Sequence, residues 1–112
     1  MRAMSFALTT AQMLAGTKTV TRRLGWKTLL PGARLRAVEK AMGLRPGEKQ
    51  RVLRLIEVVD VRVERVDAVT GDDVAREGFP DLTPAEFVEL FCRAMRVGPE
   101  AEVRRIEFRF LD

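Results

Sequence analysis

The chain has 112 residues, a net charge of +4, no histidine and a single cysteine, Cys92. This length suits one domain, 1–112, and the composition excludes an intrachain disulfide, a histidine base and a zinc centre. Any proton transfer must use lysine, aspartate, glutamate or a hydroxyl group. No apolar run approaches the ~20 residues that span a bilayer, and no signal peptide is recognisable, so we expect a cytoplasmic protein with no membrane contact. Either Met1 or Met4 is the start.

Arginine supplies most of the positive charge, with 16 arginines against 4 lysines. The guanidinium group suits bidentate contact with phosphate and stacking on bases. Codon bias in a GC-rich genome explains the same excess. The charge is therefore compatible with nucleic-acid binding but does not establish it.

The N-terminal third is expected to form a short helix followed by a β-prone stretch. Thr9 and Gln12 have the spacing of a capping box, which predicts a helix over residues 10–15 that Gly16 ends. The stretch 18–23 follows, rich in threonine, valine and arginine. These elements place a loop and a strand directly after Gly16.

The middle of the chain reads as two strands joined by a polar loop. Pro31-Gly32 marks a turn before a strand at 34–40, and residues 43–50 form the loop. The longest β signal is 52–66, where valines 59, 61 and 63 alternate with charged residues. Glu57 interrupts that alternation, which predicts a bulge or a section buried on both faces.

Two helices are expected next. Thr70 starts the first, which ends near Gly78, and the acidic pair Asp72-Asp73 suits its first turn. The second has a complete start signal: Thr83 caps it, Pro84 takes the first helical position and Glu86 completes the capping box, with Leu82 stapling onto Phe87. It runs to about Arg96, and its apolar face consists of Phe87, Leu90, Phe91, Ala94 and Met95.

The C-terminal stretch alternates as a strand with one buried face. Its inward side chains are Ile106, Phe108 and Phe110, and its outward ones are Arg105, Glu107 and Arg109. The sum is about five strands and three helices in mixed order, which predicts an α+β fold.

One short segment concentrates reactive groups. Residues 16–23, Gly-Thr-Lys-Thr-Val-Thr-Arg-Arg, hold an amine, three hydroxyls and two guanidinium groups. An edge strand with solvated charges explains that composition equally well. The order of the residues, however, resembles the signature of the ASCH family, Gly-x-Lys-x-x-Thr-x-Arg after a short first helix.

Other segments extend the resemblance over nearly the whole chain. Ala75-Arg76-Glu77-Gly78-Phe79 resembles the family's second landmark, an acidic residue followed by glycine at a helix end. The turn at Pro31-Gly32 and the terminal strand 106–111 also fit. The resemblance implies a small PUA-like mixed β-barrel of five to six strands with about three short helices.

The resemblance also implies a site. Small bacterial members of the family are amidohydrolases that remove the acetyl group of N4-acetylcytidine, and their lysine, threonine and glutamate correspond to Lys18, Thr21 and Glu77, with Arg23 beside the substrate. No metal or cofactor is implied. Thr21 would be the nucleophile and Lys18 its base, while Glu77 would orient the amine or shuttle a proton. Lys18 and Thr21 point to opposite faces of a regular strand, so they converge only if Lys18 lies in the turn after Gly16.

The sequence leaves open the role of Trp26 and the class of function. Trp26 either stacks on the base of a substrate or packs in the interior. The chain is either an amidohydrolase acting on N4-acylated cytidine or a related modified nucleoside, a non-catalytic RNA-binding module, or a ribonuclease. Its expected partner is accordingly a modified pyrimidine nucleoside or RNA, and its expected state is a monomer or weak dimer. The alternating charge signs around Val59 to Val63 weaken a broad phosphate track.

Overall fold

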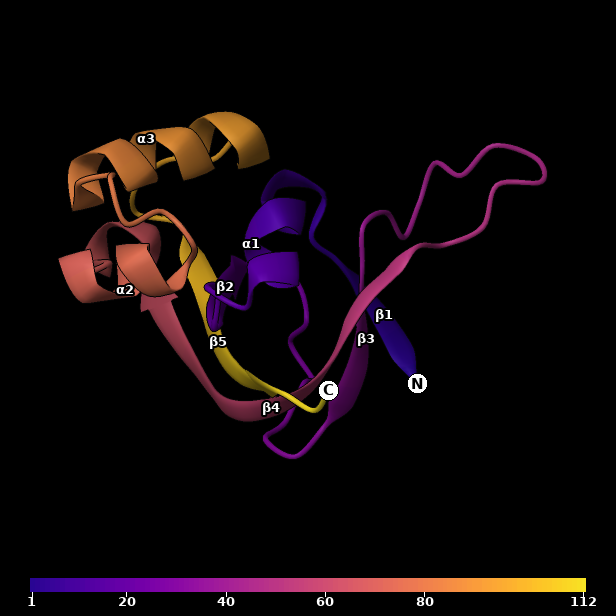
Figure 1. The fold of residues 1–112 in the computed structure, drawn as a ribbon. Coiled ribbons are helices and arrows are strands. Elements are labelled where there is room, and N and C mark those ends of the chain that lie inside the picture. Colours follow the sequence, from indigo (N-terminus) through magenta and orange to yellow (C-terminus); the bar gives the residue numbers. More distant parts are fainter.

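Five strands form one curled, mixed sheet in a computed structural model that describes residues 1–112 (Figure 1). The strand order is β1-β3-β4-β5-β2, with β1 parallel to β3 and every other pair antiparallel. The strands are β1 (Arg2–Ser5), β2 (Val20–Arg23), β3 (Arg34–Val38), β4 (Val52–Arg65) and β5 (Glu102–Phe110). The predicted α+β class and the mixed sheet of five strands are confirmed.

Three α-helices and two 3-10 turns complete the fold. The helices are α1 (Thr10–Ala15), α2 (Gly71–Arg76) and α3 (Pro84–Met95), and the 3-10 turns are η1 (Ala7–Thr9) and η2 (Val66–Ala68). The longest helix has 12 residues, and none is long and apolar enough to cross a membrane. Figure 1 shows α2 and α3 together at one end of the curl. α1 packs against β4, and its Met13 lies in the core inside the curl.

The curl is a half-barrel whose seam is joined by a side chain. β1 and β2 are the two ends of the strand order, so no backbone ladder connects them. Instead, Nη2 of Arg23 on β2 donates a hydrogen bond to the carbonyl oxygen of Ser5 on β1, at 2.7 Å. The two end strands are thus linked by one charged hydrogen bond in place of a backbone ladder.

A β-bulge bends β4, as the interrupted alternation predicts. The register with β5 shifts between Val58 and Asp60, so Val59 is the extra residue and points outward. Before the bulge, Ile56 and Val58 are buried; after it, Val61 pairs with Ile106 and packs on the same core. The bulge therefore keeps one apolar face inward while the 14-residue strand turns.

Two apolar cores lie on opposite faces of the sheet. The larger one fills the curl and includes Phe6, Met13, Ile106 and Phe108. The smaller one lies between the outer face and helices α2 and α3, and includes Val74, Phe87, Phe91 and Val103. The outer face of β5 is therefore covered in part, and Arg105, which the alternation predicts to point outward, is buried beneath α2 with 3% of its surface exposed.

One of the two predicted capping boxes forms. Thr83 Oγ1 accepts from the Glu86 N–H at 3.1 Å and Glu86 Oε1 accepts from the Thr83 N–H at 2.9 Å. The box predicted at Thr9 is wrong, because Thr9 makes no side-chain cap and the Gln12 amide donates to the carbonyl of Gly78 at 3.2 Å. A tertiary contact between α1 and the end of α2 has replaced the local one.

Glycine is required at position 78, at the end of α2, because of its positive φ and the close approach of Gln12. Its φ is +102°, and a Cβ there would lie 2.8 Å from Cγ of Gln12. We expect Gly78→Ala to lower the free energy of unfolding by about 1–3 kcal/mol more than Gly47→Ala, as measured by urea denaturation. Gly47 is the matched control because its φ is +81° with open space around it. Equal losses in the two variants would contradict the role assigned to the contact with Gln12.

Candidate functional site

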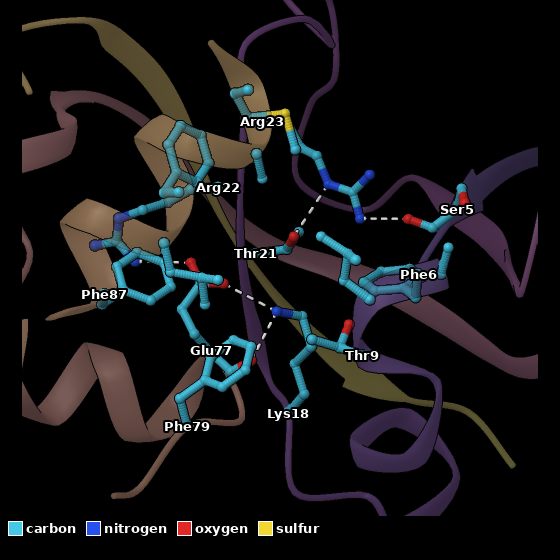
Figure 2. Close-up of a pocket in the computed structure, with 16 residues that line it drawn as sticks. Ser5, Phe6, Thr9, Lys18, Thr21, Arg22, Arg23, Glu77, Phe79 and Phe87 are labelled. Carbon is cyan, nitrogen blue, oxygen red and sulfur yellow. Dashed lines mark hydrogen bonds and ion pairs between the residues drawn. The ribbon is translucent and has the colours of Figure 1, made fainter. Parts of the chain in front are cut away.

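A cavity of about 230 Å³ opens between η1 and α3, with β2 beneath it. Polar side chains and apolar side chains both line the cavity (Figure 2). The charged side chains that line it are Lys18, Arg22, Arg23 and Glu77. The structure thus brings the predicted Lys18, Thr21, Glu77 and Arg23 to one cavity.

Lys18 reaches the cavity because it precedes the regular strand. Gly16 ends α1 with a φ of +75°, and β2 begins only at Val20. Backbone hydrogen bonds fix the intervening loop, since the Thr19 N–H donates to the Arg76 carbonyl at 2.8 Å. Lys18 therefore does not follow the alternation of the strand, and its side chain lines the same cavity as that of Thr21. This loop position of Lys18 is the one that the sequence required for the two side chains to converge.

The Lys18 amine is buried against Glu77. Its Nζ donates to the Glu77 carbonyl at 2.7 Å and to Oε1 of the same residue at 2.9 Å, with 3% of the lysine exposed. Burial lowers the pKa of Lys18 below its usual range, Glu77 opposes this, and Arg23 and Arg22 reinforce it. A neutral amine has two N–H groups and one lone pair. It can keep both bonds to Glu77 and still accept a proton.

Thr21 and Arg23 lie on the same face of β2. Nε of Arg23 donates to Oγ1 of Thr21 at 3.0 Å, and the guanidinium carbon lies 4.8 Å from the centre of the Phe6 ring. Arg23 forms no salt bridge, and burial lowers its pKa to about 10, with Glu77 opposing. Because the Thr21 oxygen accepts from Arg23, its own O–H can donate to another group, and the guanidinium can stabilise negative charge on that oxygen.

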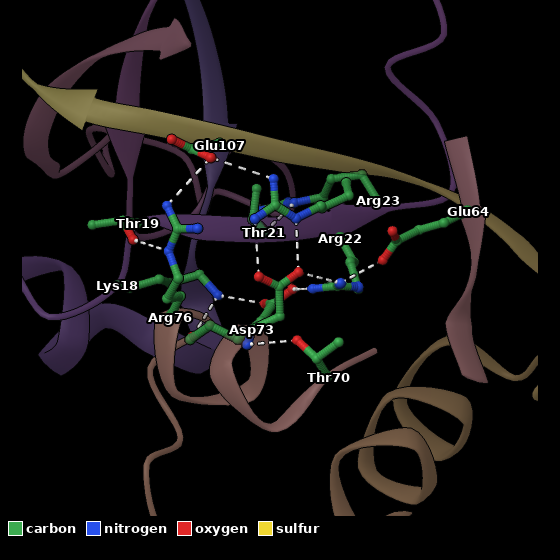
Figure 3. A network of polar contacts seen from close by, with 12 residues as sticks. Lys18, Thr19, Thr21, Arg22, Arg23, Glu64, Thr70, Asp73, Arg76 and Glu107 are labelled. Carbon is green, nitrogen blue, oxygen red and sulfur yellow. Dashed lines mark hydrogen bonds and ion pairs between the residues drawn. The ribbon is translucent and has the colours of Figure 1, made fainter. Parts of the chain in front are cut away.

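Behind the cavity, Glu77 joins a buried network of ion pairs. Figure 3 shows Arg22, Asp73 and Glu64 of this network. Its Oε2 accepts from Nη1 of Arg22 at 3.0 Å. Nη2 of Arg22 donates to Asp73 Oδ2 at 2.6 Å and also to Glu64. Arg105 donates to both oxygens of Asp73, at 2.7 and 2.9 Å. The carboxylates and cations of this network neutralise one another away from water.

Asp73 is a residue whose role the sequence did not indicate. The helix does begin at Gly71, and Thr70 caps it by accepting from the Asp73 N–H at 3.2 Å. The Asp73 side chain, however, points to the sheet, where Arg105 first and Arg22 second hold the pKa of its carboxyl well below the usual range. The shared outward direction of Arg22 and Arg105 on paired strand positions was the available signal.

The wall of the cavity is apolar and partly open. Phe79, Phe87 and Phe91 lie at its inner side. Leu90 and Met95 of α3 also line it, although 38% and 42% of their surfaces are exposed. The prediction that Leu90 on this apolar face is buried is wrong, because this part of the face, where Met95 is exposed too, borders a cavity rather than the core. Such a wall suits the flat, apolar faces of a ring.

Trp26 lies apart from the cavity. Its ring is half-buried against the core inside the curl, with the guanidinium of Arg2 4.1 Å from its centre. Its backbone has a φ of +60°.

Cys92, on α3, packs against the smaller core. No three His, Cys, Asp or Glu side chains come together as a metal site.

No family model matches the chain, and no curated protein matches its sequence. Two solved structures are similar in fold. An ASCH domain from Lactobacillus crispatus JV V101 shares 18% identity and a TM-score of 0.66 over 97% of this chain and 78% of that one. A DUF984 protein from Enterococcus faecalis V583 shares 14% identity and a TM-score of 0.65 over 100% and 77%. At these identities the likeness shows the fold, which is that of an ASCH domain.

Proposed function

Starting from the ASCH-domain fold, we propose that the chain is an amidohydrolase that acts on N4-acylated cytidine or a related modified nucleoside. The observation that carries the proposal is the meeting of Lys18, Thr21 and Glu77 at one cavity. An amine, a hydroxyl and a carboxylate are the groups that amide hydrolysis requires in a chain without histidine. The apolar wall supports binding of the base.

The first step transfers the acyl group to the protein. Neutral Lys18 takes the proton of the Thr21 hydroxyl, and the oxygen attacks the acyl carbon of the substrate. The charge that develops on the acyl oxygen is stabilised by the Arg23 guanidinium, which already donates to Thr21. The carbon–nitrogen bond then breaks, and the proton held by Lys18 passes to the leaving amino group of cytidine.

The second step restores the protein. A water molecule gives its proton to Lys18 and attacks the acyl-threonine ester, which releases the carboxylic acid and returns the proton to Thr21. Glu77 accepts two hydrogen bonds from the lysine and stabilises the ammonium form that appears in each step. Its own charge is balanced from behind by Arg22.

The surface charges favour a small substrate over long RNA. Many arginines are already paired with carboxylates: Glu57 holds both Arg34 and Arg109, and Asp112 holds Arg54. Paired guanidinium groups release fewer counterions when they meet phosphate. The cavity, at about 230 Å³, also has room for a base rather than for a strand.

The proposal is tested by offering N4-acetylcytidine and unmodified single-stranded RNA in parallel and following both by chromatography. We expect conversion of N4-acetylcytidine to cytidine, with intact RNA. Shortened RNA would identify a ribonuclease instead. Intact substrates together with tight RNA binding, whose affinity falls steeply with salt, would identify a binding module and refute the hydrolase.

The proposed steps use protein side chains alone, so hydrolysis is expected to continue undiminished in excess EDTA. The physical reason is that Lys18 supplies the base and Arg23 the stabilising charge, the two tasks a metal ion performs in other hydrolases. The measurement compares initial rates of cytidine release before and after dialysis against EDTA. A loss that added divalent cation restores would contradict the mechanism.

A further inference from the structure

Arg22 links the cavity to the network on the other side of the sheet. It follows Thr21 in β2, so its side chain points to the opposite face, toward α2. There it is buried, with 3% of its surface exposed. Its two terminal nitrogens bind three carboxylates: Glu77, Asp73 and Glu64. Its Nε has no hydrogen-bond partner, so all the hydrogen bonds of its side chain are made by those terminal nitrogens.

Glu77 is held by two cations at once. It lies at the C-terminal end of α2, beyond the last helical residue, Arg76. Its Oε1 meets the Lys18 amine, and its Oε2 is held by Arg22. Asp73 in turn is held by Arg105 on β5, so Arg22 is anchored from a neighbouring strand. A continuous series of ion pairs therefore connects Arg105 on β5, through Asp73, Arg22 and Glu77, to the Lys18 amine.

We propose that Arg22 is a positioning residue which, anchored by Asp73 and Glu64, binds the second oxygen of the Glu77 carboxylate and so sets how strongly that carboxylate holds the Lys18 amine. The proposal rests on the amidohydrolase function and adds to it a residue outside the Lys-Thr-Glu set. Arg22 itself does not touch the reacting atoms in this scheme. It acts through Glu77.

The charges around Lys18 give the direction of the effect. Glu77 faces it from the end of α2, and Arg22 and Arg23 face it from β2. The parts of η1 and α3 that line the cavity contribute only uncharged residues. Of these groups Glu77 raises the pKa of Lys18, whereas Arg23 and Arg22 lower it, in addition to burial. Removing the charge of Arg22 therefore leaves more of the lysine protonated.

The test compares Arg22→Gln with Arg22→Lys in the pH profile of kcat/KM for N4-acetylcytidine. Activity rises with pH as Lys18 loses its proton. In Arg22→Gln we expect the rising limb to move to higher pH, with a loss on the order of tenfold at neutral pH and recovery on the alkaline plateau to within about twofold. Arg22→Lys keeps the charge and is expected to stay near the wild-type midpoint. An equal loss at every pH would overturn the proposal.

Arg22→Gln leaves each carboxylate a partner. Asp73 keeps Arg105, Glu77 keeps Lys18, and Glu64 keeps Arg62. If the variant nevertheless fails to fold, Glu64→Gln tests the same point from the other side. It removes a carboxylate that neutralises Arg22, so the limb is expected to move to lower pH. Arg109→Gln, which removes a surface charge that contacts only Glu57, is the control and should leave the profile unchanged.

A measurement without substrate separates this proposal from the function itself. The chain has only four lysines, so NMR resolves the Lys18 side chain, which is assigned by its loss in Lys18→Met. We expect its titration to move up in Arg22→Gln and down in Glu64→Gln. If wild-type protein hydrolyses nothing while these shifts occur, the hydrolase fails and the positioning role stands. If hydrolysis occurs and the titration does not move, the positioning role fails alone.

Discussion

Thr21→Val is expected to lower kcat for N4-acetylcytidine by about 10⁴-fold or more, the scale seen when a hydrolase loses its nucleophile. Valine keeps the volume of the side chain and removes the hydroxyl that accepts from Arg23. The carbonyl of Ser5 still holds that arginine, so the seam of the half-barrel stays joined. The rate is measured as cytidine release at saturating substrate.

Thr19→Val is the matched control. Thr19 is two residues away, does not line the cavity, and its hydroxyl accepts only a long bond of 3.4 Å from Arg76. We expect its rate to remain within about threefold of wild type. A loss of less than about tenfold in Thr21→Val would show that the hydroxyl positions water or substrate and is not the nucleophile.

Asp73→Asn has the largest expected effect on stability, a loss of about 3–5 kcal/mol in the free energy of unfolding. Asparagine keeps the shape but leaves the buried Arg22 and Arg105 without the carboxylate that they share. Asp72→Asn is the matched control, because Asp72 is the exposed neighbour on the same helix. Its loss should stay within the ~0.3–1 kcal/mol of a charge near a helix N-terminus. Urea denaturation at neutral pH measures both.

The free energy of unfolding is expected to depend on pH through Asp73. The pKa of Asp73 is lowered by Arg105 and Arg22 from its ordinary 3.8, so the unfolded chain binds this proton more readily than the folded one. The stabilisation is therefore present above about pH 4 and is lost as the pH falls below that value. Asp73→Asn should lose stability less steeply in acid than wild type does. Parallel acid curves would contradict the assignment.

The elements that local chemistry dictates were predictable from the sequence. The start of α3 follows from Thr83, Pro84 and Glu86, which act within one turn of the chain. The bulge in β4 followed from the broken alternation at Glu57, and the loop position of Lys18 from Gly16. In each case the cause and its effect lie within a few residues.

What the sequence did not indicate depends on contacts between distant segments. Asp73 meets Arg22 across 51 positions and Arg105 across 32. Gln12 meets Gly78 across 66 positions, a contact that replaced the local cap. The exposure of Leu90 likewise depends on η1 lying opposite α3 and leaving a cavity between them. Such contacts between distant residues leave no periodic pattern in the sequence that could predict them.

Release of cytidine and acetate from N4-acetylcytidine by wild-type protein and by Lys18→Met tests the central claim most directly. Methionine has a similar length and keeps the site filled, and Arg22 still pairs with Glu77. We expect equimolar cytidine and acetate from wild type, and a loss of about 10²–10⁴-fold in Lys18→Met, the contribution of a general base. Equal rates in the two proteins, or no release by wild type at any pH, would contradict the account.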